Sequence, residues 1–203
     1  YNMIRNQKKA AYVNTGAWAK KAAKEFSFVG ELDIIASSED KNYSYIPKNI
    51  VAGSDYDFLH ITSNNTISGT QYKDFPTSDT PLVCDMSSDI FSRKINVADF
   101  DIIYAGAQKN MGPAGTAVYI VKESILGNSS IPIPTMLDLN THYSKDSMFN
   151  TPPVFAIYAS MLNLRWLKKN GGVGHIQNVN EKKATLLYNE IDNNPLFEGT
   201  TAI

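Results

Sequence analysis

The 203-residue sequence contains a single cysteine, Cys84, so the chain cannot form an internal disulfide. A lone cysteine is typical of reducing compartments, and we expect a cytoplasmic protein. No apolar run approaches the ~18–20 residues that a membrane-spanning helix needs, so we expect no membrane contact. An excess of one charge is also missing, because 19 Lys and Arg against 20 Asp and Glu leave a net charge of -1. We therefore expect no nucleic-acid partner, and no clustered metal ligands are present either.

The most informative segment runs from Phe100 to Val121. Its pattern predicts a strand over 100–105, a run of small residues, a turn that carries Lys109, and a second strand over 116–121. Small residues before the turn would allow a flat ring to lie against the backbone. A lysine amine in such a place can form a Schiff base with a carbonyl compound. The alternative is an ordinary solvated lysine in a hairpin loop.

The rest of the sequence predicts an α/β domain with a mainly parallel sheet flanked by helices. The link around Lys109 is too short for a parallel crossover, so that strand pair should be antiparallel. Three helices are expected, with Thr15 and Thr151 as N-caps of the first two, Pro152 at the first helical position of the second, and a broad buried apolar stripe on that second helix. The predicted strands are 31–36, 56–62, 81–85, 100–105 and 116–121, and the predicted helices are 15–26, 152–169 and 181–191.

Several polar or aromatic residues have both a structural and a functional interpretation. Asp85 ends a predicted strand, where it could cap the next turn or pair with a protonated ring nitrogen. Trp18 could be a core residue or a stacking platform for a flat ligand. Thr66 could satisfy its own turn, and Asn150 and Thr151 could cap a helix or bind a phosphate group.

The run Tyr104-Ala-Gly-Ala-Gln-Lys-Asn110, followed by Gly112-Pro-Ala-Gly115, resembles the cofactor-lysine segment of the phosphoserine aminotransferases. These are fold-type I enzymes that depend on pyridoxal 5′-phosphate (PLP), and similar segments extend from about Asn14 to about Asp192. The resemblance implies that Lys109 forms the Schiff base, Asp85 keeps the ring nitrogen protonated, Trp18 stacks on the ring and Thr66 bonds the phenolic oxygen. It also implies that Gln108 meets the cofactor phosphate together with Asn150 and Thr151 of a second subunit, in a homodimer.

The reaction implied by the resemblance is transamination between L-glutamate and 3-phosphohydroxypyruvate, in serine biosynthesis. It also implies a large PLP-binding domain over 1–178, and a helix over 179–203 that leads into a small domain. Against that family an N-terminal portion and most of a C-terminal domain are missing, so we expect a fragment or a partly ordered chain. The family's substrate-binding arginines are not identifiable, which leaves a catalytically silent binding or dimerisation module as an alternative. A desulfurase of the same fold type is a third possibility, but Cys84 lies in a predicted strand and not in a mobile loop.

Overall fold

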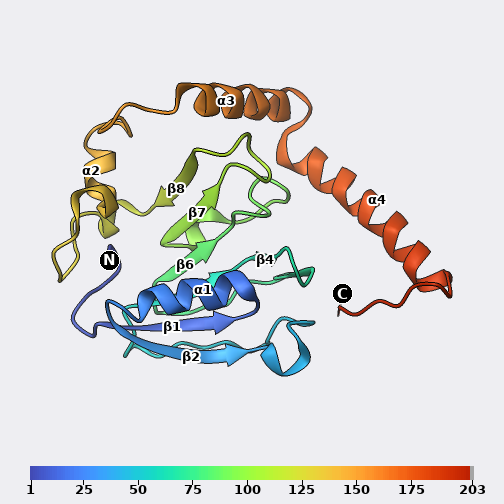
Figure 1. Ribbon diagram of the computed structural model, residues 1–203, viewed down its shortest axis with the longest axis horizontal. Coiled ribbons are helices and arrows are strands. Elements are labelled where there is room, and N and C mark those ends of the chain that lie inside the picture. The colour runs from blue at the N-terminus through green and yellow to red at the C-terminus, as the bar shows by residue number, and fades with distance from the viewer. Residues whose placement is uncertain (202–203) are drawn as a thin grey trace.

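In the computed structural model, residues 1–201 are described, and they form an α/β domain around one six-stranded sheet (Figure 1). The strand order is β2 (Glu31–Ser37), β1 (Lys9–Asn14), β3 (Phe58–Thr62), β6 (Leu82–Asp85), β7 (Ile102–Gly106) and β8 (Ala117–Val121). The first five strands are parallel, and β8 pairs with β7 in the antiparallel direction. The predicted fold class is thus confirmed, including the one antiparallel pair around Lys109.

Strand β1, which lies between β2 and β3, was not among the predicted strands. Ala10 and Ala11 give the segment little β propensity, and its burial comes from the layers on both sides. A small hairpin, β4 (Asn64–Asn65) with β5 (Thr70–Gln71), was also missed because its strands are only two residues long. The five strands that were predicted are all present.

Successive side chains of the central strands point to opposite faces of the sheet, so the core has two layers. Residues such as Tyr12, Phe58 and Ile102 face α1 (Ala17–Phe26), and their cluster includes Ala23 and Phe26 of that helix. Residues of the opposite parity, such as Leu59 and Ile103, pack against loops on the other face. Both faces of the parallel strands are therefore covered, as is usual for such sheets.

The predicted N-caps are both wrong. Helix α1 starts after Gly16, and the Thr15 hydroxyl donates to the Asn65 side chain at 3.4 Å instead of capping the helix. Helix α3 (Val154–Lys169) starts after Pro153, with no side-chain cap. Two consecutive prolines keep the chain before Val154 out of the helical conformation, so Thr151 and Pro152 precede the helix.

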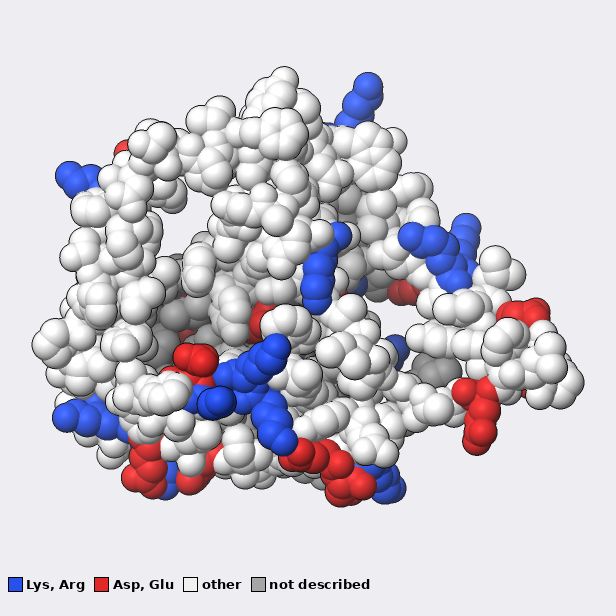
Figure 2. Space-filling model, viewed as in Figure 1, with Lys and Arg blue, Asp and Glu red and all other residues white. Residues whose placement is uncertain are grey.

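The buried apolar stripe predicted for α3 is also wrong. Only Ala156 and Ser160 of this helix are buried, whereas Phe155 is 76% exposed and Trp166 is 55% exposed. The side of the helix that carries small residues faces the domain, where Gly112 lies close to Ser160 and Gly115 lies close to Ala156. Figure 2 shows few charged side chains over the face along α3. The large apolar residues of α3 lie on the outer surface.

The C-terminal part of the chain is helical and loosely attached. After the short α2 (Leu139–Tyr143) and α3, helix α4 (Gly172–Asn193) extends away from the sheet and has no buried residue (Figure 1). The third predicted helix is confirmed but begins nine residues earlier than expected, so the proposed boundary at 178 falls inside α4. Single-turn 3-10 helices lie at Glu39–Lys41, Val97–Asp99, Glu123–Ile125 and Thr135–Leu137. Among the described residues, no helix is both long and apolar enough to cross a membrane.

Candidate active site

Four parallel strands end at one edge of the sheet, and each is followed closely by a predicted site residue. Trp18 follows β1, Thr66 follows β3, Asp85 ends β6 and Lys109 follows β7. These strands are consecutive in the sheet, so the segments that leave them lie side by side. Ligand sites of open α/β sheets lie at this carboxyl edge.

Lys109 is in direct contact with one of these residues and close to another. Its Nζ donates to the Thr66 hydroxyl at 2.6 Å and lies 6.0 Å from the centroid of the Trp18 ring. The Lys109 side chain is exposed, as is that of the neighbouring Gln108. The amine is therefore accessible to a small molecule and is already positioned beside a hydroxyl and an aromatic face.

The turn that carries Lys109 is fixed from three sides. The amides of Met111 and Gly112 both donate to the Ala107 carbonyl, at 3.0 and 2.9 Å. The Asn110 side chain donates to the Ile90 carbonyl at 2.5 Å, and the Asn163 side chain of α3 donates to the Met111 carbonyl at 2.8 Å. These contacts hold the lysine at a defined place although its own side chain is solvent-exposed.

Gly112 is required for this packing. A Cβ on Gly112 would lie 3.0 Å from the Ser160 Cα and closer still to the Ser160 hydroxyl. Any side chain at this position would push α3 away from the lysine turn. The glycine that punctuates the lysine segment thus serves helix packing.

The loop that carries Thr66 is anchored by the residues immediately before it. The Ser63 hydroxyl donates to the Asp89 carboxylate, and the Asn64 side chain donates to the Ser88 hydroxyl at 2.9 Å. The Asn65 side chain donates to the Thr70 hydroxyl at 3.2 Å across the hairpin. A Cβ on Gly16 would lie 2.7 Å from the Asn65 Oδ1, so the glycine before α1 allows the Trp18 and Thr66 segments to approach each other.

Asp85 has the local partner that the structural interpretation predicted. Its Oδ1 accepts a hydrogen bond from the Ser87 amide at 2.8 Å, while the Ser87 hydroxyl accepts one from the Gly106 amide at 3.1 Å. The turn after β6 is thereby tied to the end of β7. Asp85 is half-buried, and its other oxygen has no hydrogen bond to any described residue. The hydrogen bond to the Ser87 amide uses one carboxylate oxygen of Asp85, and the other could bind a further donor.

Trp18 is not a core residue. Its side chain is 47% exposed, and the Lys21 ammonium lies 4.6 Å from its ring centroid. An exposed indole beside the lysine amine offers a flat apolar surface at the site.

The structure does not bring Asn150 and Thr151 to Lys109. Both are exposed, and the Asn150 side chain donates to the Met136 sulfur at 3.1 Å. The part of α3 that touches the lysine turn is Ser160 and Asn163, more than two helical turns further along the helix. Within one chain these two residues do not belong to the site around Lys109.

A buried polar group lies beneath the carboxyl edge that was not among the predicted site residues. His60 is 3% exposed, its Nε2 lies 2.9 Å from the Tyr104 hydroxyl, and its ring stacks on Tyr12 at a centroid distance of 4.7 Å. Burial lowers the pKa of His60 to about 4, while the charge of Asp85 acts in the opposite direction. A histidine alternating with apolar residues in a strand was the only available signal.

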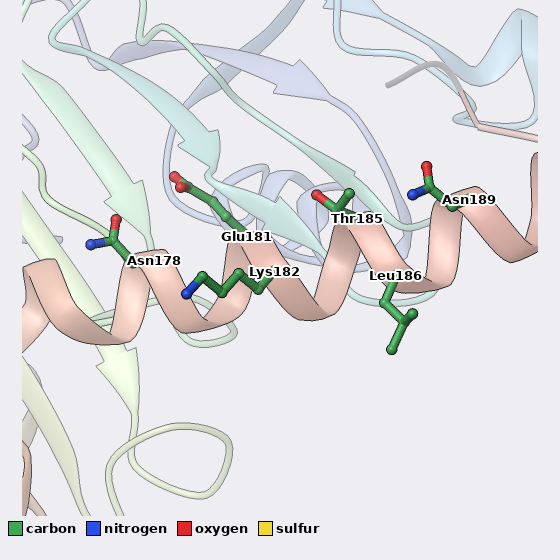
Figure 3. Close-up of a pocket in the computed structure, with 6 residues that line it drawn as sticks. All are labelled: Asn178, Glu181, Lys182, Thr185, Leu186 and Asn189. Atoms are coloured by element: carbon green, nitrogen blue, oxygen red, sulfur yellow. The ribbon is translucent and has the colours of Figure 1, made fainter.

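Two hollows of the described structure are lined by none of the predicted site residues. One, of about 460 Å³, is bounded by α3, β8 and the segment around Met111, and its walls are mainly apolar. The other, of about 520 Å³, is formed by one face of α4 and is drawn in Figure 3. The hollow on α4 presents few convergent groups because a single helix forms it, and the hollow beside α3 has mainly apolar walls, so neither offers the amine, hydroxyl and carboxylate found at the carboxyl edge. No group of metal-binding side chains occurs among residues 1–201.

The fold and the lysine-bearing edge together define a class of protein. The model of the family "Aminotransferase class-V" matches residues 1–202, and the chain belongs to this family. Curated relatives include the phosphoserine aminotransferases of Flavobacterium psychrophilum, 58% identical over 98% of this chain, and of Azobacteroides pseudotrichonymphae, 56% identical over 100%. The chain covers 56% of the length of each of these relatives, that is, about half.

Solved structures give the same result. A phosphoserine aminotransferase from Bacillus circulans subsp. alkalophilus is 44% identical, with a TM-score of 0.89 over 93% of this chain and 53% of its own. A PLP-bound phosphoserine aminotransferase from Trichomonas vaginalis is 31% identical, with a TM-score of 0.92 over 99% of this chain and 58% of its own. The residues of the carboxyl edge therefore lie on the fold of a family of aminotransferases.

Proposed function

We propose that the protein is a PLP-dependent aminotransferase whose cofactor binds at the carboxyl edge of the sheet. The observation that carries this proposal is the position of the Lys109 amine, which lies 2.6 Å from the Thr66 hydroxyl and beside the exposed face of Trp18. These residues fit the cofactor: an accessible primary amine for its aldehyde, an aromatic platform for its ring and a carboxylate for its nitrogen. When bound, PLP supplies an electron sink for the carbanion that forms at the substrate Cα.

Each residue then has a defined task. Lys109 would hold the cofactor covalently, and its amine, once exchanged for the substrate amine, would be free to move a proton to and from the substrate Cα. Thr66, the present partner of that amine, would donate to the phenolic oxygen. Asp85 would retain a proton on the ring nitrogen through its charge, since two unit charges ~4 Å apart at an effective dielectric of ~20 attract by about 4 kcal/mol. Trp18 would stack on the ring, and Gln108 would bind the phosphate.

The substrates we propose are L-glutamate and 3-phosphohydroxypyruvate, giving phosphoserine and 2-oxoglutarate in serine biosynthesis. The relatives at 58% and 56% identity carry the name phosphoserine aminotransferase, which supports this choice over other reactions of the family. The large domain would extend to residue 178. With only one cysteine, Cys84, and that one buried, a cytoplasmic location fits the chain.

The active unit we propose is a homodimer in which Asn150 and Thr151 reach the partner's cofactor phosphate. Two observations favour this arrangement. Both residues are exposed and lie away from Lys109 of their own chain. The adjoining outer face of α3 exposes large apolar residues, as interfaces do: Val154, Phe155, Tyr158, Leu162 and Trp166.

The decisive experiment traps the cofactor. Protein incubated with PLP and reduced with borohydride should carry a pyridoxyl group on Lys109, located by peptide mass spectrometry. Lys109→Ala should carry none, while Lys24→Ala, which removes an exposed lysine of α1, should be labelled normally. Labelling of a different lysine would contradict the assignment.

The dimer and the silent-module alternative are tested by mixing variants. Lys109→Ala and Thr151→Ala chains, each impaired alone, should form heterodimers in which one site has both an intact lysine and an intact partner threonine. Recovered phosphoserine formation supports the shared site. Full labelling of Lys109 without turnover, at the length of the curated relatives, would favour a binding module that has lost catalysis.

A further inference from the structure

Three aromatic side chains from strands β1, β3 and β7 form a polar layer behind the proposed site. His60 of β3 is the register partner of Tyr12 of β1, and the two rings are 22° from parallel. The Tyr104 hydroxyl of β7 lies 2.9 Å from the His60 Nε2. Thus β1, β3 and β7 each contribute one member, and all three lie on the face that α1 covers.

Asp85 belongs to the same layer. Thr62, two residues after His60, is the register partner of Asp85, and Asp85 is the register partner of Tyr104. Register partners in a parallel sheet lie on the same face, so Asp85, Tyr104 and His60 are neighbours across three strands. This position explains why the charge of Asp85 opposes the burial effect on the pKa of His60.

The layer contains two buried polar atoms that no described residue satisfies. These are the Nδ1 of His60 and the hydroxyl of Thr62, which follow each other on one face of β3. Buried polar groups without partners are rare in folded proteins and are often connected with function. Burial keeps His60 neutral, so its ring has one N–H and one bare nitrogen.

We propose that His60, held by Tyr104, is a positioning residue that stabilises the charge of Asp85. In this arrangement Tyr104 donates its hydroxyl proton to Nε2, which places the remaining ring proton on Nδ1, an atom without a hydrogen-bond partner among the described residues. A donor near the carboxylate favours its charged form. A charged Asp85 would hold a proton on the ring nitrogen of a bound cofactor. This inference rests on the proposed function, because Asp85 has this task only when PLP is bound.

Other titratable groups around His60 do not offer the same effect. Tyr12 on β1 is a phenol whose pKa is raised by burial, and Tyr119 on β8 stacks on Tyr104. The buried residues of α1, which covers this face, are Ala19, Ala23 and Phe26. Asp85 is therefore the group near His60 whose charge a buried hydrogen-bond donor on this histidine would stabilise.

The test measures the bound cofactor and not only turnover. The absorption of the cofactor bound to Lys109 changes with pH, and the midpoint of this change is the quantity to be measured. A proton on the ring nitrogen lowers the midpoint, because its positive charge and the positive charge of the protonated linkage to Lys109 belong to one conjugated system. His60→Phe keeps the stacked ring but removes both nitrogens, so the midpoint should rise by about one pH unit, a tenfold change in the proton equilibrium. Tyr104→Phe should shift it in the same direction by less.

Two further variants separate positioning from packing. His60→Asn keeps a polar group near the Nδ1 position, so it should restore much of the midpoint, whereas His60→Gln, which mimics Nε2, should not. Phe58→Leu, in the same layer but without a polar atom, should lower stability and leave the midpoint unchanged. Tyr104→Phe provides the test if the His60 variants do not fold.

The outcomes are distinct. The inference is overturned if Lys109 binds the cofactor in every variant and the midpoints of His60→Phe and Tyr104→Phe match that of the unsubstituted protein; the proposed function then stands. If the unsubstituted protein forms no adduct on Lys109, the proposed function fails, and this inference fails with it.

Discussion

Replacement of Asp89 by alanine should destabilise the protein and weaken its cofactor site together. Asp89 is 7% exposed, accepts hydrogen bonds from Ser63 and from Gln71 at 3.1 Å, and lies 3.5 Å from the Arg93 guanidinium, whose side chain is 16% exposed. Removing the carboxylate leaves a nearly buried positive charge and two donors without their acceptor. The loss of one partner from a buried ion pair costs about 3–5 kcal/mol of unfolding free energy.

The site should respond because Ser63 begins the segment that leads to Thr66. Urea unfolding measures the stability, and a PLP titration followed by absorption measures the affinity, which should fall. Asp74→Ala removes an exposed carboxylate from a neighbouring loop and should change the unfolding free energy by less than about 0.5 kcal/mol. The reasoning is refuted if Asp89→Ala unfolds within about 1 kcal/mol of the unsubstituted protein.

Three more predictions follow from the geometry. Gly112→Ala should lower the unfolding free energy by about 1–3 kcal/mol because its Cβ meets Ser160, and adding Ser160→Gly should recover part of the loss in chemical denaturation. Burial depresses the pKa of His60 to about 4, so below pH 6.5 the unfolded state takes up a proton on this histidine that the folded state does not. The free energy of unfolding should therefore fall by about 2 kcal/mol from pH 7 to pH 5. His60→Phe should remove this component, and an unchanged dependence of the unfolding free energy on pH would contradict the assignment. Trp18→Ala should weaken PLP binding by about 0.5–1.5 kcal/mol, measured by titration, with little effect on thermal unfolding because the indole is 47% exposed.

The sequence was sufficient for the elements whose local pattern and chemistry agree. The strands around Cys84 and Ile103 have apolar, β-favouring residues on both faces, and the turn at Lys109 has its glycines, so these strands and the place of the Lys109 turn at the edge of the sheet could be predicted from the residues. Strand β1 could not be predicted in this way. Ala10 and Ala11 have little intrinsic β propensity, and their segment forms a strand because it pairs with a strand on each side. The N-caps failed for a related reason: a threonine before a helix can bond to a distant side chain, as Thr15 does to Asn65.

Periodicity also could not say which side of α3 is buried. The pattern identifies apolar positions such as Phe155 and Leu162, but not what covers them. In the structure, the close approach at Gly112 allows the small side of the helix, at Ser160, to face the domain. Burial on α3 is therefore determined by backbone contact with the lysine turn, and the large residues remain outside.

This arrangement couples whatever packs on the outer face of α3 to the site itself. Asn163 and Ser160 hold the turn of Lys109 from the inner side of the same helix. A second copy of the chain, or any further part of the protein, that buried Phe155 and Trp166 would fix α3 against that turn. Because a partner that binds only the ordered arrangement stabilises it by mass action, association and lysine positioning should strengthen each other. Helix α3 thus has the exposed apolar residues on its outer side and contacts the Lys109 turn with its inner side.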